Sequence, residues 1–294
     1  VLEEIARSQD TPEDYVYDLF SEAMYPHDAL GRPVLGTPDT VSSFDTDEMH
    51  RYHDAHYTTG NITVVACGSV DHAVIVDLAE RYLSGLPVGP WLERGPVDAH
   101  ERVMLSCVKK DSEQANIVLG APTIVNDDPR RFAYSLLDII IGGGMSSRLF
   151  QEIREKRGLV YSVYASSQLY EGAGIFEMYA GTRPENIAEV VKVATEQFAL
   201  AAQDGLTADE LARAKELAAG SFVLGTESTR TRMSRLGRLA VLDLPIDSID
   251  EIIEKYRAVT LEEVNEAARE LFTQEMTLAV VSPYKQEKIE RMLK

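Results

Sequence analysis

The spacing of apolar residues along the 294-residue chain predicts an alternation of helices and strands. Helical periodicity covers residues 1–24 and stops at Tyr25-Pro26, and a second helix is predicted over about residues 46–56. Residues 61–68 are β-branched and bounded by glycines, so they predict a buried strand. Asp71 then caps a helix that is predicted to end near Leu83.

Residues 86–96 are rich in glycine and proline and predict a linker, which places a domain boundary between residues 95 and 96. Beyond it we predict strands at about 102–109 and 115–119, a helix over 129–141, a Gly142-Gly143-Gly144 turn and a short helix to 157. Strands at 161–170 and 174–181, four or five helices between 184 and 272, and a last strand at 276–281 complete the pattern.

Two stretches of the chain resemble each other. Residues 46–65 and 260–279 each consist of a predicted helix, an aromatic residue and a β-prone segment, and each leads into another helix. We therefore expect an α+β fold of two homologous domains: residues 1–95 as the C-terminal part of the first domain, truncated at its N-terminus, and residues 96–294 as the second. About 100 residues of the first domain are expected upstream of Val1. Chance likeness of two helix-strand-helix units is the alternative.

The formal net charge of −19 is spread along the whole chain, which makes nucleic acid an unexpected partner and favours basic peptides as ligands. A merely soluble, self-repelling surface is the alternative. No run of about 18 uncharged apolar residues occurs, so no membrane span is expected. Cys67 and Cys107 both lie in apolar runs and favour a reducing compartment, the cytoplasm.

Several kinds of chemistry lack support in the sequence. The triple-glycine turn is followed by Met-Ser-Ser-Arg-Leu-Phe rather than by a Lys-Ser/Thr pair, there is no Gly-x-Ser-x-Gly elbow, and neither cysteine has an obvious histidine partner. His50, His53 and His56 share one predicted helix, but they spread over 120° of its surface and converge poorly on one ion. We interpret them as a solvated helix face.

Glu4 lies beside apolar residues in the opening helix, and its neighbours on the same side of the helix are Val1 and Ser8. This position predicts a carboxylate that points inward, where it would need a cation, a metal or a hydrogen-bond donor. An ordinary surface glutamate is the alternative.

Arg154 and Tyr161 form a second candidate constellation within the stretch 142–161. They are seven residues apart across a predicted helix-to-strand turn at Gly158, and a guanidinium held next to a phenol suits a developing oxyanion, since both groups donate hydrogen bonds. The alternative is a salt-bridged arginine and a strand tyrosine at the end of a sheet.

At three stretches, residues 1–5, 25–36 and 142–161, the chain resembles the pitrilysin/insulinase family of zinc metallopeptidases, in the branch of the processing peptidases. The resemblance implies zinc as cofactor and Glu4 as one of its ligands. The family's His-x-x-Glu-His motif is absent from this sequence, and the resemblance places it before Val1. It further implies that Arg154 and Tyr161 reach the substrate carbonyl and that Gly142, Gly143 and Gly144 form part of a substrate-binding chamber wall. The family resemblance also implies that each of the two domains is a mixed sheet with helices.

The function that the resemblance implies is a zinc-dependent endopeptidase that cleaves peptides or unfolded segments in a clamshell chamber, with zinc-activated water as the nucleophile. A homodimer or a paired subunit is implied as well. The chain by itself is expected to be inactive, because it lacks the histidine ligands. The main alternative is a non-catalytic partner or core subunit of the same family, which binds peptide or protein without cutting it. An unrelated α+β interaction domain is a third reading.

Overall fold

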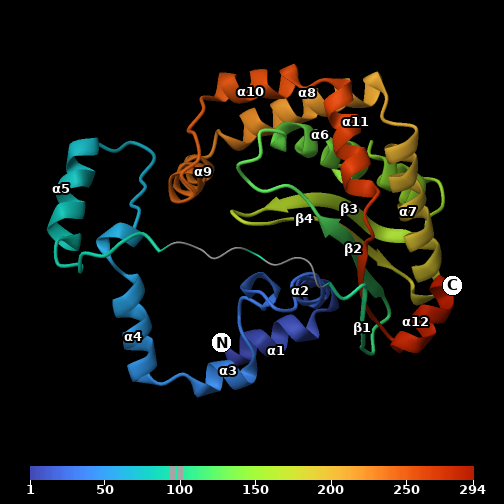
Figure 1. The fold of residues 1–294 in the computed structure, drawn as a ribbon, viewed down its shortest axis with the longest axis horizontal. Helices are drawn as coiled ribbons and strands as arrows, with labels where there is room; N and C mark the ends of the chain where they lie inside the picture. Colours follow the sequence, from blue (N-terminus) through green and yellow to red (C-terminus); the bar gives the residue numbers. More distant parts are fainter. Residues whose placement is uncertain (93–96, 98–101) are drawn as a thin grey trace. The chain divides into compact units, whose positions relative to one another are not determined.

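The computed structural model describes residues 1–92, 97 and 102–294 (Figure 1). The chain divides into two compact units. The first comprises Val1–Pro38, Pro96–Ala218 and Lys255–Lys294, and the second comprises Asp39–Gly95 and Ala219–Glu254.

A five-stranded mixed sheet organises the first unit. Its strands are β1 (Leu105–Lys109), β2 (Ala115–Pro122), β3 (Val160–Leu169), β4 (Gly174–Thr182) and β5 (Thr277–Ser282), in the spatial order β1-β5-β2-β4-β3. The β1–β5 pair is parallel and the other pairs are antiparallel. β4 and β5 are buried along their whole length, whereas the edge strand β3 alternates between buried and exposed residues. These elements confirm the predicted α+β class.

Helices cover both faces of this sheet (Figure 1). On one face, α6 (Arg131–Gly142), α7 (Ile187–Gln203) and α11 (Leu261–Phe272) pack together over the main core, and α12 (Gln286–Leu293) packs against α7 and β1. The 3-10 turn η4 (Pro184–Asn186) leads into α7, and the π-helix η3 (Phe150–Glu155) follows α6. The apolar stripes of these helices explain the arrangement, because each stripe is buried against the sheet or a neighbouring helix.

The N-terminal segment covers the opposite face of the sheet. α1 (Leu2–Asp10) and α2 (Pro12–Met24) replace the single predicted helix over residues 1–24, because Pro12 begins a new helix at its first position. α2 packs against β5, β2 and β1 and buries Val16, Phe20 and Met24. A Cβ atom at Gly120 of β2 would lie 2.7 Å from the Phe20 ring, so glycine is required for this close approach. The 3-10 turn η1 (Ala29–Gly31) follows α2.

The second unit contains α4 (Thr46–His56), the 3-10 turn η2 (Thr59–Asn61), α5 (His72–Leu83) and α9 (Thr229–Val241). α3 (Pro38–Ser43), α8 (Ala208–Gly225) and α10 (Ile249–Ala258) each contribute residues to it. None of the hydrophobic side chains described in this unit is buried.

The predicted buried strand at residues 61–68 is wrong. Residues 62–67 pair with no strand among the residues that the structure describes, and the Val64 side chain is 53% exposed. A single β-prone segment has no ladder of its own, so it forms a strand only where a neighbouring strand supplies hydrogen bonds. The predicted division of the chain at residues 95/96 into two homologous domains stays a prediction.

Within the described residues, no helix is both long and apolar enough to cross a membrane.

Candidate functional site

The triple-glycine turn follows α6 and begins against the edge strand. A Cβ atom at Gly142 would lie 2.3 Å from the Ala165 backbone nitrogen of β3, and one at Gly143 would lie 2.6 Å from the Ile139 Cα atom. Gly144 has a φ of +159° and open space where a Cβ atom would be. The first two glycines therefore permit close packing and the third permits the backbone turn. Their predicted role in a substrate-binding wall remains a prediction.

Arg154 and Tyr161 lie on either side of the turn at Gly158, whose φ is +62°. The Arg154 guanidinium lies over the Phe150 ring, 5.1 Å from its centroid. The ladder between β3 and β4 shifts register between Val160 and Ser162, so Tyr161 has no paired residue opposite it, and its side chain is 51% exposed.

The phenol of Tyr161 contacts Arg183, a residue that the sequence analysis missed. The Arg183 Nε atom donates to the Tyr161 hydroxyl at 3.4 Å, and this hydrogen bond raises the pKa of Arg183. The signal that could have found it is the β3–β4 pairing, because Val160 lies opposite Thr182 and brings residue 183 next to residue 161. This end of the hairpin therefore presents a phenol and a guanidinium, both able to donate to a carbonyl oxygen.

Glu4 faces solvent, which corrects the predicted inward orientation. Its side chain is 58% exposed. The buried residue of α1 is Ile5, the next residue along the helix, so Glu4 lies about 100° away from the buried side. The structure thus gives Glu4, Arg154 and Tyr161 separate neighbours. The metal-binding role of Glu4 and the catalytic roles of the other two remain predictions.

The described residues do not fit a zinc centre. No group of three or more His, Cys, Asp or Glu side chains among them could hold a metal ion, whereas protein zinc sites use three or four such ligands. In α4, the His56 Nδ1 atom lies 2.8 Å from the Tyr52 carbonyl oxygen, and the His53 ring stacks on Tyr57. His53 and His56 are thus each engaged by residues within one helix turn. No zinc-dependent step can be assigned to this part of the chain.

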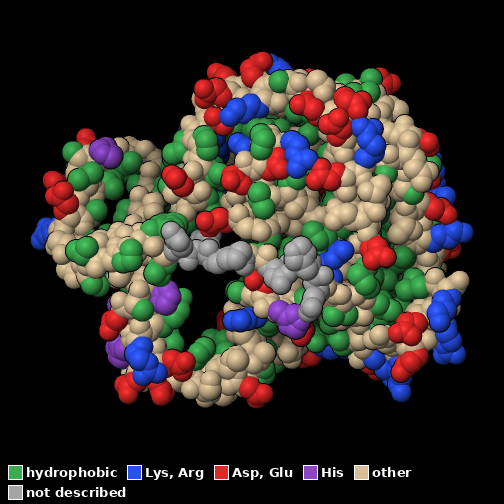
Figure 2. Space-filling model, in the orientation of Figure 1, with side chains coloured by type: hydrophobic (Ala, Val, Ile, Leu, Met, Phe, Trp, Pro, Cys, Tyr) green, Lys and Arg blue, Asp and Glu red, His purple; other side chains and the backbone are tan. Residues whose placement is uncertain are grey.

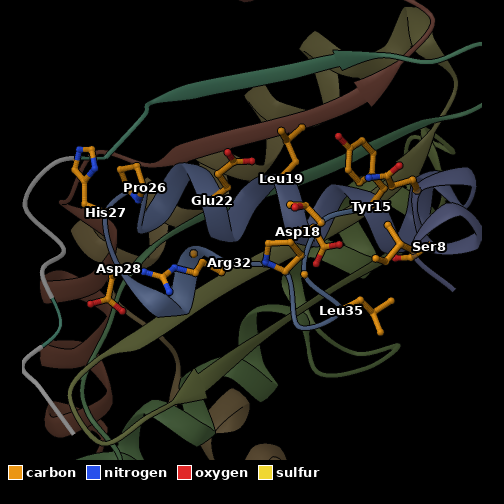
Figure 3. Close-up of a pocket in the computed structure, with 16 residues that line it drawn as sticks. Ser8, Tyr15, Asp18, Leu19, Glu22, Pro26, His27, Asp28, Arg32 and Leu35 are labelled. Atoms are coloured by element: carbon orange, nitrogen blue, oxygen red, sulfur yellow. The ribbon is translucent and has the colours of Figure 1, made fainter. Parts of the chain in front are cut away.

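A cavity of about 440 Å³ opens within residues 5–37 (Figure 3). Figure 3 shows Leu19 and Glu22 on α2 and Arg32 and Leu35 on the segment that follows it. Its lining combines aliphatic, aromatic and acidic side chains; the lining residues are Ile5, Ser8, Gln9, Tyr15, Asp18, Leu19, Glu22, Pro26, His27, Asp28, Gly31, Arg32, Pro33, Leu35, Gly36 and Thr37.

Negative charge dominates this cavity. Three carboxylates (Asp18, Glu22 and Asp28) line it, against one arginine, Arg32. Burial, together with the nearby Asp14 carboxylate, raises the pKa of Asp18. Burial also raises the pKa of Tyr15, and the Glu22 and Asp18 carboxylates add to the effect. The cavity is therefore suited to a cationic group with an apolar stem, such as a lysine or arginine side chain.

The fold and this site define a protein with a helix-covered mixed sheet, an acidic cavity and a pair of exposed hydrogen-bond donors. A family model described as "Peptidase M16 inactive domain" matches residues 43–217. An uncharacterized zinc protease of Streptomyces coelicolor is 38% identical over 99% of this chain and 65% of its own length. An uncharacterized zinc protease, YmxG, of Bacillus subtilis is 36% identical over 96% of this chain and 69% of its own length. The chain therefore belongs to the peptidase M16 family.

Solved structures agree with the fold. A peptidase M16 inactive domain from Pseudomonas fluorescens has a TM-score of 0.89 and 24% identity, covering 97% of this chain and 68% of that one. A chain in complex III from Candida albicans has a TM-score of 0.87 and 16% identity, covering 99% of this chain and 73% of that one. The expected kinship with the pitrilysin/insulinase metallopeptidases is confirmed at the level of the family. The chain spans about two thirds of the length of the relatives it matches.

Proposed function

We propose that this chain is the peptide-binding part of an M16 zinc endopeptidase and that it does not itself hold the metal. The observation that carries the proposal is the acidic cavity of residues 5–37, which offers three carboxylates beside aliphatic and aromatic walls. Its ligand is a peptide or unfolded segment that inserts a basic side chain. Membership of a family whose relatives are named zinc proteases supports the peptide as the class of ligand.

The chain's own residues bind and orient the peptide in this proposal. Asp18 and Glu22 attract the cationic group, while Ile5 and Leu19 contact its apolar stem. Arg154 and Tyr161 donate hydrogen bonds to a carbonyl oxygen of the bound chain, and Arg183 orients the Tyr161 phenol. Because the described residues form no zinc centre, hydrolysis is not assigned to them, and the chain by itself is expected to leave peptides uncut.

We also propose that the chain works as a homodimer or as one of two paired subunits. The support is the likeness of its fold to a chain in complex III, which is a multi-subunit assembly by its name. The cytoplasm is the proposed compartment, and the support is that Cys67 and Cys107 are both free thiols.

Binding of short fluorescent peptides, measured by anisotropy at low salt, tests the proposed ligand. A lysine-rich or arginine-rich unfolded peptide should bind, and a glutamate-rich peptide of equal length should not. The double variant Asp18→Asn/Glu22→Gln should weaken binding by about 5- to 30-fold, the loss expected for two partly exposed charge contacts. A matched control, Asp209→Asn/Glu216→Gln on α8, removes the same charge outside the cavity and should leave the affinity nearly unchanged. Equal losses in both variants would show that only net charge attracts the peptide.

A non-catalytic partner or core subunit is the second candidate function. It is favoured by the match to a domain described as inactive. It is also favoured because the described residues contain no group of three or more side chains that could hold a metal ion. The two candidates separate when the chain is mixed with an M16 fragment that carries a His-x-x-Glu-His motif and zinc. Cleavage of a quenched basic peptide by the mixture supports the peptidase, whereas binding without cleavage supports the partner subunit.

A further inference from the structure

Arg148 lies between the glycine turn and η3, and its side chain is only 17% exposed. Its guanidinium forms a two-pronged contact with Glu210 at the start of α8: the Nε atom donates to Oε1 at 2.7 Å and the Nη2 atom to Oε2 at 2.9 Å. Nη2 also donates to the Gly205 carbonyl oxygen at 3.1 Å. Such a fork fixes both the distance and the orientation of an arginine.

Glu210, the acceptor of this two-pronged contact, is itself held in place. The Thr207 backbone nitrogen and hydroxyl donate to the Glu210 Oε2 atom at 2.8 and 2.9 Å, as in a helix cap. The next residue back, Leu206, donates its backbone N–H to the Asn265 side chain of α11 at 2.7 Å. Arg148 is thus connected, through one turn, to two helices of the main core.

The segment that Arg148 anchors carries one candidate donor, Arg154, and leads into β3, which carries the other, Tyr161. It is bounded by Gly144 and Gly158, which both have positive φ, and it contains a π-helix, whose geometry is less regular than that of an α-helix. Leu149 and Ile153 bury their side chains completely on the inner side, while Arg154 stacks on Phe150. A short segment of this kind between two permissive glycines needs contacts outside itself to keep one geometry.

We propose that Arg148 is a positioning residue: its fork to Glu210 fixes the segment 144–158, and with it the placement of Arg154 and Tyr161 toward the bound peptide. This inference rests on the proposed peptide-binding function. Burial alone would raise the pKa of Glu210, but the hydrogen bonds from Arg148 and Thr207 outweigh it and lower that pKa to about 2. The anchor therefore keeps both of its charges at neutral pH.

The test compares two arginine-to-lysine variants. Arg148→Lys keeps the positive charge but cannot form the fork, whereas Arg130→Lys removes a comparable fork, to Asp128 and Glu270, at the start of α6. Hydrogen exchange is followed at the amides of Gln151, Lys156 and Gly158, which donate within the segment. Exchange there should become at least about 10-fold faster in Arg148→Lys and stay unchanged in Arg130→Lys.

Peptide affinity gives a second test. An ion pair that only stabilises the fold would not couple to Arg154 in peptide binding, whereas a positioning residue would. Arg148→Lys and Arg154→Ala should each weaken binding of the fluorescent basic peptide by about 3- to 10-fold, and the double variant should lose less affinity than the two single losses combined, because part of the effect of Arg148 passes through Arg154. Additive losses would overturn the positioning role, because they would mean that Arg148 acts independently of Arg154.

Glu210→Gln, which keeps the shape of the carboxylate, replaces Arg148→Lys if the latter does not fold, and the same exchange and affinity shifts are expected. Unchanged exchange in residues 148–158 of a folded fork variant overturns the inference. If the wild-type chain does not bind the basic peptide at all, the proposed function fails instead, and the exchange result still decides whether Arg148 holds the segment.

Discussion

Residues 46–83 and residues 260–293 follow the same order of helix, β-prone segment and helix, yet only the second stretch contributes a strand to a sheet. β5 lies between β1 and β2, and it is buried along its whole length. Residues 62–67 have no strand beside them in the described part of the chain, and neither α4 nor α5 buries a residue. The space-filling view shows hydrophobic side chains at the surface of the chain (Figure 2). On α4 and α5, the exposed hydrophobic side chains include Met49, Tyr52, Val74 and Tyr82.

The difference between these stretches shows which properties are local. Both have a side-chain cap at the start of the first helix, since Asp45 caps α4 and Thr260 caps α11. Helix formation therefore follows from nearby residues in both places. The strand forms only in the second, because the pairing strands come from residues far away along the chain.

A charge placed in each β-prone segment should give the largest difference between the two stretches in the free energy of unfolding. Val280 is fully buried and lies opposite Cys107 in β1 and Ile117 in β2. Val280→Asp should lower the free energy of unfolding by at least about 4 kcal/mol, since it buries an unpaired carboxylate. Val64→Asp should change it by less than about 0.5 kcal/mol. Urea unfolding followed by circular dichroism measures both, and similar losses would show that residues 62–67 are packed.

The aromatic residues that end the two helices should give the next largest difference. Phe272 stacks on Phe198 at 4.7 Å between ring centroids and meets Phe176 edge-on at 5.3 Å. Phe272→Ala should cost about 3–5 kcal/mol through the cavity it leaves. Tyr57 is half-exposed and stacks only on His53 among its described ring contacts, so Tyr57→Ala should cost less than about 1 kcal/mol. Thermal unfolding of the two variants decides, and a large loss for Tyr57→Ala would contradict the account.

A buried carboxyl group makes the sheet-containing region sensitive to pH. Asp138 of α6, which packs against α11, accepts hydrogen bonds from the Ser167 backbone nitrogen at 2.8 Å and from its hydroxyl at 2.9 Å. Burial raises the pKa of Asp138 to about 7, although these hydrogen bonds lower it.

Since the pKa of Asp138 is higher in the folded chain than in the unfolded one, the folded chain binds the extra proton, and stability should fall as pH rises from about 4 to 7. Asp138→Asn should remove this slope and stabilise the chain at pH 8 by about 1–2 kcal/mol. Urea unfolding of both proteins across that pH range tests it, and a slope that persists in the variant would assign it to other groups.

Removing the helix caps should give the smallest loss of stability. Unlike the substitutions above, it should cost about the same in both stretches. Thr260 accepts from the Glu263 backbone nitrogen at 3.2 Å, and Asp45 accepts from the Glu48 backbone nitrogen at 2.7 Å. Thr260→Ala and Asp45→Ala should each destabilise their own helix by about 1 kcal/mol. Amide exchange in the first turns of α11 and α4 measures this, and a loss confined to α11 would mean that α4 does not depend on its cap.

The sequence predicted the second part of the fold well, because its signals are local or lie within one buried element. The strands β2 to β5 and the helices α6 and α11 fall where apolar spacing and glycines place them. The strand prediction failed at residues 61–68, where the β-branched run is present but no described strand pairs with it. The break at Pro12 inside a continuous apolar pattern was also missed.

The candidate site was predicted in part for the same reason. The turn at Gly158 between Arg154 and Tyr161 was visible in the sequence, and the structure has it. Glu4 turned outward because Ile5, not Glu4, occupies the buried side of α1. Arg183 was missed although the predicted β3–β4 hairpin brings it near Tyr161, because their contact depends on the exact register of residues 22 positions apart. Glu210 could not be found, since its contact with Arg148 joins residues 62 positions apart. Such contacts depend on strand register and helix packing, which single-sequence patterns do not fix.

The most direct test of the account is the affinity of the chain for a fluorescent basic peptide, measured by anisotropy with and without excess EDTA. The account predicts the same dissociation constant in both conditions, because the acidic cavity and the Arg154 and Tyr161 donors need no metal. Loss of binding in EDTA, with recovery on adding zinc, would contradict it and show that a metal ion holds the peptide.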